Sequence, residues 1–413
     1  MIGRKPAADL PGWETRLYLI EYPPGAAAPV HVHPAIGVGF VIDGRFESAF
    51  GDEPVVEVQR GQGFVDQADV PHRVFRNPSV DHGLRFVVAY TLRVGEEPLH
   101  LAPATTVLNQ PALFPESAAY DEQRGRFLVG SFREGGVYEV FPGGDVRAVV
   151  QDPRLVSVLG IAVDATRGRL LVTNADLGAA RRSSPAGPKT LAALGIYELA
   201  SGAPIHYVDL GALLPKGNHL ANGLTVDAEG NAYVTDSFSP VIYKVTPAGQ
   251  PSVFLEDHAF EGVGIGLNGL AYHPDGYLLV VKKSDGKLFR VPVADSRRFT
   301  EVELPRPLIG ADGVVIVNRE QVVVISNETS GVVANEAVAL DSHDGWRTAT
   351  ITAVRPLGKV YPTSGVIAHG TLFAMHSGLN QLIAGTPAVR DQLQNRATIQ
   401  PIGRAAPLQL FAP

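Results

Sequence analysis

The chain has 413 residues, of which 45% are hydrophobic, and its 44 glycines and 32 prolines are typical of a soluble, turn-rich β protein large enough for two domains. Its formal net charge of −7 and the lack of a Lys/Arg-dense segment argue against nucleic acid or an anionic membrane as a partner, and they favour a small-molecule ligand. With no cysteine, the chain has no disulfide, no thiolate nucleophile and no Cys-based zinc site.

Residues from about 15 to 100 form short apolar and polar runs separated by Gly and Pro, which predicts a small β-barrel or jelly roll. His31 and His33 share one face of a strand, because alternate side chains on a strand point the same way. His72 follows on a later strand and is positioned to complete a three-histidine cluster. Imidazoles suit zinc, iron, nickel or copper, so we expect a transition metal here. The alternative is a barrel with a structural role, such as packing or dimerisation.

This region resembles the cupin family in two short motifs. The matching positions are Gly25, His31, His33, Pro34 and Gly44 in the first motif and Gly61, Pro71, His72 and Asn77 in the second. One position departs, because Gly37 stands where the first motif carries a glutamate. The resemblance therefore implies a metal on three neutral ligands with open positions for substrate or water. A homodimer through this barrel is a further candidate.

After a predicted linker at residues 95–103, six segments share one pattern, a small residue that opens an apolar strand. They cover residues 116–121, 159–164, 222–227, 268–273, 312–317 and 364–369, and each is followed by a second apolar run. Repeats of this length with several strands each are typical of a propeller. We therefore expect an all-β chain with a cupin-type barrel over residues 1–103, a six-bladed propeller over 104–390 and a C-terminal tail over 391–413.

The second interval between repeats is longer than the others by roughly 20 residues. The extra residues are expected within residues 177–194, a polar and turn-rich stretch that is unlike a core strand. A long loop on one face of a propeller is often a lid.

The repeats place Glu116, Asn222, Asn268 and Asp312 at the same point of the unit, so radial repetition directs them at one axis. Two carboxylates and two amide oxygens suit a hard cation, calcium first and otherwise magnesium, manganese or zinc. The alternative is a set of polar residues that only hydrate a central channel.

The same segments resemble the senescence-marker-protein/gluconolactonase/luciferin-regenerating-enzyme family, which includes regucalcin and bacterial sugar lactonases. The matching stretches are Phe114-Pro115-Glu116, Ala221-Asn222-Gly223-Leu224, Leu267-Asn268-Gly269-Leu270-Ala271 and Ala311-Asp312-Gly313-Val314, with Tyr233-Val234-Thr235-Asp236-Ser237 after the third repeat. The resemblance implies a divalent metal on Glu116, Asn268 and Asp312, with Asn222 on metal or substrate. Leu220 stands where the sugar lactonases often carry arginine, so the substrate stays open.

The chemistry expected in the channel is hydrolysis. A cation there would polarise a lactone carbonyl and lower the pKa of a bound water, and Asp312 or Asp236 is the candidate proton acceptor. The remaining residues expected to bind substrate are Asn222, His219, Asn174, Lys283 and His376.

The most favoured function is therefore metal-dependent hydrolysis of a lactone or related cyclic ester. One alternative is a cupin-centred metalloenzyme, an oxygenase, isomerase or lyase, with the propeller binding substrate or carrying out a second step. Another is a non-enzymatic small-molecule sensor or interaction platform. The sequence shows neither a charged-then-apolar leader nor an apolar run of about 18 residues, so we expect a cytoplasmic protein.

Overall fold

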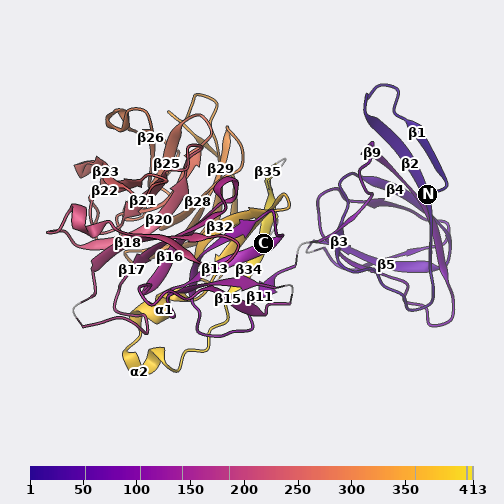
Figure 1. The fold of residues 1–413 in the computed structure, drawn as a ribbon. Coiled ribbons are helices and arrows are strands. Elements are labelled where there is room, and N and C mark those ends of the chain that lie inside the picture. The colour runs from indigo at the N-terminus through magenta and orange to yellow at the C-terminus, as the bar shows by residue number, and fades with distance from the viewer. Residues whose placement is uncertain are drawn as a thin grey trace. The chain divides into compact units, whose positions relative to one another are not determined.

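The computed structural model describes all residues except 52, 103, 142, 186, 359, 406, 407, 412 and 413, and the chain divides into two compact units, residues 1–104 and 105–411 (Figure 1). Both units are built from β-strands. Within the described residues, no helix combines the length and the hydrophobicity needed to cross a bilayer.

The first unit consists of two five-stranded sheets, in the orders β1-β2-β9-β4-β7 and β10-β3-β8-β5-β6. Their strands are β1 (Gly3–Pro6), β2 (Trp13–Tyr22), β3 (His31–Val32), β4 (Gly37–Asp43), β5 (Arg45–Phe50), β6 (Val56–Gln59), β7 (Gly63–Asp66), β8 (His72–Arg76), β9 (Leu84–Arg93) and β10 (His100–Leu101). In β9, buried and less buried residues alternate, because a strand buries one face at a time. The core joins both sheets through Val41, Phe46, Phe75 and Phe86. This is the predicted cupin-type barrel.

The segment predicted as a linker is partly built into the barrel. In β10, His100 pairs with Val32 and Leu101 with His31. Residues 95–101 therefore belong to the first unit, while Pro103 lies outside the described residues.

The second unit is the predicted six-bladed propeller. The first three blades contain β12 (Pro115–Asp121), β13 (Arg126–Ser131), β14 (Gly136–Val140) and β15 (Val146–Val150); β16 (Ser157–Asp164), β17 (Arg169–Ala175), β18 (Thr190–Glu198) and β19 (Pro204–Asp209); and β20 (His219–Val226), β21 (Ala232–Asp236), β22 (Val241–Val245) and β23 (Pro251–Glu256). The next two contain β24 (Leu267–His273), β25 (Tyr277–Lys282), β26 (Lys287–Pro292) and β27 (Thr300–Glu301); and β28 (Ala311–Ile316), β29 (Gln321–Thr329), β30 (Val332–Asp341) and β31 (Thr350–Pro356).

The sixth blade brings together segments from both ends of the unit. Its strands are β32 (Pro362–Ala368), β33 (Thr371–His376) and β34 (Thr398–Ala405), with β11 (Thr106–Val107) and β35 (Leu408–Leu410) both paired to β34. Short helices occur in connections: η1 (Ala165–Arg167), η2 (Gly211–Leu213), η3 (His258–Phe260), η4 (Ser296–Arg298), α1 (Leu379–Ala384) and α2 (Pro387–Arg390).

The apolar core of the propeller lies between neighbouring blades. Six clusters of buried residues each join two adjacent blades, as Leu279 and Val281 of β25 do with Val322 and Val324 of β29. The inner strands contact one another around the ring, β12 with β16 at one side and with β32 at the other.

A register shift in every inner strand explains the small residue that opens each repeat. The shifts lie between Pro115 and Ala118, Val158 and Ile161, Ala221 and Leu224, Leu267 and Leu270, Ala311 and Gly313, and Pro362 and Gly365. A Cβ on Gly223 would lie 2.4 Å from the Asn268 carbonyl oxygen, and one on Gly269 only 2.1 Å from that of Asp312. The inner strands approach too closely there for a larger residue.

The expected C-terminal tail differs from what the structure shows. Residues of β34 pair along β33 and form the third strand of the sixth blade, and the chain passes through α1 and α2 to reach it. Pro401 and Gly403 weaken the strand signal of this segment, since both residues are unfavourable in strands.

The expected lid at residues 177–194 is shorter in the structure, because β18 begins at Thr190. The remaining loop is fastened to the first blade and to the connection that follows it. Arg182 Nη1 donates to the carbonyl oxygens of Gly135 and Leu155, each at 2.8 Å.

Candidate metal centre and propeller channel

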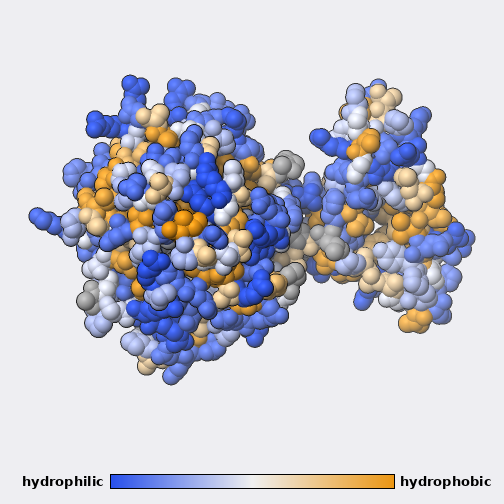
Figure 2. All heavy atoms as spheres, in the orientation of Figure 1, coloured by the Kyte–Doolittle hydropathy of each residue, from blue (hydrophilic) through white to orange (hydrophobic). Residues whose placement is uncertain are grey.

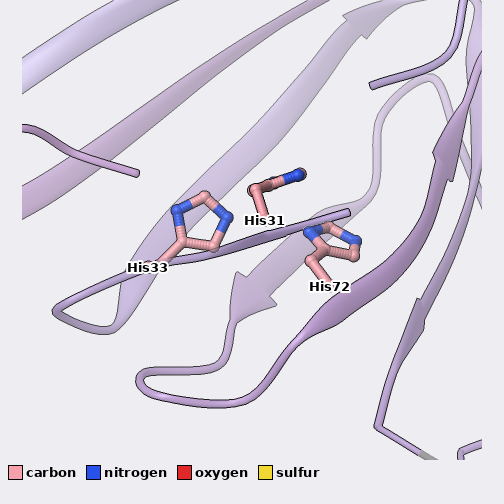
Figure 3. A group of neighbouring side chains, drawn as sticks. All are labelled: His31, His33 and His72. Atoms are coloured by element: carbon pink, nitrogen blue, oxygen red, sulfur yellow. The ribbon is translucent and has the colours of Figure 1, made fainter. Parts of the chain in front are cut away.

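The barrel brings His31, His33 and His72 together (Figure 3). His31 of β3 pairs directly with His72 of β8, and His33 lies two residues further on the same face. Ring centroids are 4.8 Å apart for His31 and His33 and 4.9 Å apart for His31 and His72. One ligand nitrogen from each residue lies within 4.8 Å of the other two, and none of the three residues is more than 4% exposed.

Hydrogen bonds hold the three rings in place and leave nitrogens free. The Nδ1 atoms of His31 and His33 donate to the carbonyl oxygens of Pro29 at 2.8 Å and Pro98 at 2.9 Å, and His72 Nε2 bonds to Ser48 Oγ at 2.8 Å. Among the described residues, His33 Nε2 and His72 Nδ1 are buried with no hydrogen-bond partner. A buried polar atom left unpaired costs about 1–3 kcal/mol, which a metal ligand bond would relieve.

Burial also keeps these rings in the form that binds metals. It lowers the pKa of His31 and of His33, and it lowers the pKa of His72 to about 3, with the two neighbouring histidines adding to the effect. At neutral pH all three imidazoles are therefore uncharged, as ligation requires. The residues present fit a transition metal.

A carboxylate absent from the sequence motif is supplied by a neighbouring strand. Gly37 of β4 pairs with Asp66 of β7, and a Cβ on Gly37 would lie 3.0 Å from Asp66 Oδ2. That oxygen is 3.7 Å from His33 Nε2 and accepts a hydrogen bond from the Tyr90 hydroxyl. Burial raises the pKa of Asp66 to about 6, against the lowering effect of the Tyr90 bond. Asp66 was not predicted from the sequence, because a single carboxylate in a short strand is a weak signal.

The histidines line a small cavity of about 100 Å³ with mainly apolar and aromatic walls. Tyr18, Ile20, Phe86 and Val88 form much of the lining, and Leu99 reaches it from the segment before β10. Among the residues that the structure describes, Asp66 is the only carboxylate that lines this cavity. The cavity suits a compact, largely apolar molecule.

In the propeller, the four predicted axial residues lie around one cavity of about 190 Å³. Glu116, Asn222, Asn268 and Asp312 are 3–7% exposed. Glu116 accepts a hydrogen bond from Ser117 Oγ at 2.7 Å, and Asn222 Nδ2 donates to Ser237 Oγ at 3.0 Å, so these side chains are oriented by their neighbours.

A lysine ammonium occupies this cluster. Lys283 Nζ donates to Asp312 Oδ2 at 2.7 Å, to the Tyr361 hydroxyl at 3.3 Å and to Asn327 Oδ1, while Asn327 Nδ2 also donates to Asp312. Lys283 is only 4% exposed, so the ammonium is an internal counterion. Burial lowers the pKa of Lys283, but Asp312 and Tyr361 together raise it by more.

Lys283 changes the charge that a metal would meet. Burial and the nearby Asp312 carboxylate raise the pKa of Glu116, which favours its neutral form. Asp312 is already neutralised by the ammonium. The formal charge is thus −1 or less in magnitude, instead of the expected −2, and a divalent cation would be repelled by Lys283. As they stand, these residues do not fit a divalent metal ion.

An apolar cluster lies next to the first residues of the inner strands. Phe114, Leu159 and Leu220, which precede or open the register shifts of three inner strands, pack with Leu379 and Leu382 of α1. The cavity is lined instead by later residues of the inner strands.

His219 and Asp236 form a buried pair outside the cavity. His219 Nδ1 lies 2.8 Å from Asp236 Oδ2, and Asp236 Oδ1 accepts from the Leu220 amide at 2.8 Å. Hydrogen bonding to Asp236 raises the pKa of His219 in spite of burial. Neither residue lines the channel, so the structure does not bring Asp236 to a reacting centre.

Asn174 and His376 are also absent from the channel wall. Asn174 is fully buried and holds a connection, with its Oδ1 accepting from the Val156 amide at 2.7 Å and its Nδ2 donating to the Tyr207 hydroxyl at 2.8 Å. His376 lines a separate cavity. Of the predicted substrate-binding residues, Asn222 lines the channel cavity and Lys283 contacts Asp312.

Comparisons with known proteins agree with these two architectures. Residues 18–90 match the family model described as Cupin domain. The structure is similar to the allergen Mala s 1 from Malassezia sympodialis, with 17% identity, 73% of this chain and 96% of that chain covered and a TM-score of 0.56. It is also similar to regucalcin, described as a calcium-binding protein, from Agrobacterium tumefaciens, with 17% identity, 75% and 96% covered and a TM-score of 0.50. A search of curated proteins found no match. The chain thus joins a cupin domain to a six-bladed propeller, and at these identities the likeness extends to the fold alone.

Proposed function

We propose that the protein is a metal-dependent enzyme whose reacting centre is the histidine cluster of the cupin domain. The observation that carries the proposal is the convergence of three buried, uncharged imidazoles, two of which carry a ring nitrogen without a partner. Zinc, iron, nickel or copper is the expected metal. A bound ion would supply Lewis acidity to an oxygen atom of the substrate.

The protein's own groups define what the site can do with a substrate. Pro29, Pro98 and Ser48 orient the rings, and mainly apolar and aromatic walls surround a cavity of about 100 Å³. Asp66 and Tyr90 share a hydrogen bond beside His33 and are placed to accept or return a proton. This combination favours isomerase, lyase or oxygenase chemistry on a compact, largely apolar molecule that has one oxygen donor.

The test is metal binding by the full chain. Wild type, His33→Ala and His82→Ala are stripped of metal, titrated with zinc, iron, nickel and copper, and examined by elemental analysis and calorimetry. His82 is the control because it is an exposed histidine of the same unit. We expect one equivalent of metal in wild type and His82→Ala and little in His33→Ala. Equal metal content in all three proteins would refute the proposal.

Hydrolysis of a lactone in the propeller channel is the second candidate, favoured by the carboxylates and amides around the 190 Å³ cavity. Lys283 counts against a divalent cation there, so no step is assigned to one. The test is a lactone panel with and without calcium, manganese and zinc. Hydrolysis that is lost in Asp312→Ala and kept in His31→Ala would move the chemistry to the channel. Metal loading of the barrel without turnover of any substrate class would favour a sensor.

We also propose that the barrel forms a homodimer through the outer face of β4 and β7. Val38 and Val65 pair directly across these strands and are 62% and 59% exposed, and Phe40 beside them is 48% exposed. Figure 2 shows hydrophobic residues at the surface of this unit. An apolar sheet face of this kind is typical of an interaction site. Light scattering should find a dimer that Val38→Glu makes monomeric and Val80→Glu, a matched change at an exposed loop valine, does not.

A further inference from the structure

The propeller contains a second cavity of about 420 Å³ that no part of the proposed function uses. It lies at the fifth and sixth blades, and its wall includes Asn335, Tyr361, His376 and Ser377. Among the described residues, none that lines this cavity also lines the channel. Its volume is in the lower part of the range that holds small-molecule ligands.

Three residues of this wall have a buried polar atom without a hydrogen-bond partner among the described residues. The atoms are His376 Nδ1, Ser377 Oγ and Asn335 Oδ1, and His376 and Ser377 are only 5% and 3% exposed. Native proteins leave few such atoms, since each loses its bonds to water without replacement. All three atoms belong to residues that line one cavity, which makes a ligand in that cavity the candidate partner.

The bonds that these residues do make define what the ligand must offer. His376 Nε2 lies 2.7 Å from Gln400 Oε1 and donates to it, so the neutral ring presents Nδ1 as an acceptor. Asn335 Nδ2 donates to the Gly358 carbonyl oxygen at 3.2 Å, which leaves its Oδ1 as a second acceptor. Asn335 also has a φ of 44°, in the left-handed region, a strain that often accompanies functional positions.

The remaining lining indicates a ligand without net charge. Arg396 and Glu328 contribute one charge of each sign, and the other polar groups are amides and hydroxyls. Tyr361, Val333 and Val360 add an apolar surface. A hydroxyl group of a ligand can both donate and accept a hydrogen bond. It can therefore pair with the two acceptor atoms, His376 Nδ1 and Asn335 Oδ1, and with the Ser377 hydroxyl. We propose that this cavity binds a neutral, polyhydroxylated small molecule of monosaccharide size, with its C–H face on Tyr361.

The site is independent of the metal centre, so it goes beyond the proposed function. It meets the hydrogen-bond network of the channel at Tyr361, whose hydroxyl lies 3.3 Å from Lys283 Nζ, and at Glu328, whose backbone amide donates to Asn327 Oδ1 at 2.7 Å.

The test uses the full chain and four probes, glucose, galactose, mannose and myo-inositol, at millimolar concentration in saturation-transfer NMR and calorimetry. Ser377→Ala removes an unpartnered hydroxyl, so the folded protein should be no less stable without ligand. Its affinity for the bound probe should fall by about 3- to 10-fold, the effect of one neutral hydrogen bond. Ser326→Ala is the matched control, because its Oγ is also buried and unpartnered among the described residues but lines neither cavity.

Saturable binding of one probe, weakened in Ser377→Ala and unchanged in Ser326→Ala, would support the proposal. Binding of equal strength in all three proteins would overturn the location of the site. No binding of any probe would overturn the ligand class and leave water as the partner of these atoms.

Discussion

Replacing Lys283 by methionine tests whether an ammonium stands where a divalent cation was expected. The substitution keeps the length of the side chain and removes its charge, so Asp312 is left buried and unpaired beside Glu116. Breaking a buried pair by removing one partner costs about 3–5 kcal/mol. For a domain of this size that is a drop in Tm on the order of 5–10 °C.

Calcium should then stabilise Lys283→Met but not the wild-type protein. In Lys283→Met, the freed carboxylates can accept a cation, and an ion at 100 times its Kd returns about 2.7 kcal/mol of stability, which is part of the loss. Wild type should gain nothing from calcium in its propeller transition. Differential scanning calorimetry with and without calcium, together with a calcium titration by isothermal calorimetry, measures both effects.

Two control variants distinguish the loss of the Lys283–Asp312 ion pair from a general effect of removing a lysine charge. Lys287→Met removes a lysine from an exposed pair with Glu301 and should change stability little. The double variant Lys283→Met/Asp312→Asn leaves no buried charge unpaired and should recover most of the stability. The reasoning is refuted if wild type is stabilised by calcium as strongly as the variant, or if Lys283→Met is as stable as wild type.

Three further changes test other parts of the structure. Asp66→Asn should weaken metal binding by the barrel by about 10- to 100-fold in a calorimetric titration, and unchanged affinity would exclude Asp66 from the centre. Because bonding to Asp236 raises the pKa of His219, its contribution to the free energy of unfolding is fully present below the unfolded-state value near about 6.5 and is lost as pH rises through the higher folded-state pKa. In His219→Asn, denaturant unfolding should lack that decline, whereas an unchanged pH profile would assign it to other groups. Gly269→Ala should cost about 1–3 kcal/mol or more in thermal unfolding, since its Cβ would meet a carbonyl oxygen at 2.1 Å, while Gly63→Ala, with its nearest atom at 3.5 Å, should cost less.

The barrel and the propeller could both be predicted from the sequence, because each has a local sequence pattern. Small residues recur in the propeller repeats because inner strands nearly touch at Gly223 and Gly269, and this steric need appears directly in the sequence. The spacing of His31, His33 and His72 follows from strand geometry. In contrast, β34 carries Pro401 and Gly403, and its pairing with β33, β11 and β35 is what identifies it as a strand.

The charge of the channel could not be predicted from the sequence in the same way. Repeat register locates Glu116 and Asp312 on the axis, but nothing in the register says which way the flexible side chain of Lys283 extends. It could lie in solvent or bond to Asp312, and the two placements give the site different charges. Asp66 poses the same problem across strands, because its closeness to Gly37 depends on the β4–β7 register. In both cases, contacts between residues far apart in the sequence determine where the charged side chain lies.

The order of translation also determines when the ring of the propeller can close. The ribosome releases the cupin domain complete, since all of its strands precede residue 104. The short strand β11 comes next, but its partner β34 is translated only near the end of the chain. Until then β11 has no strand partner, and the apolar faces of the first and fifth blades that pack against the sixth blade stay uncovered. Because such a distant contact is slow to form, this interval is when the nascent protein most needs a chaperone.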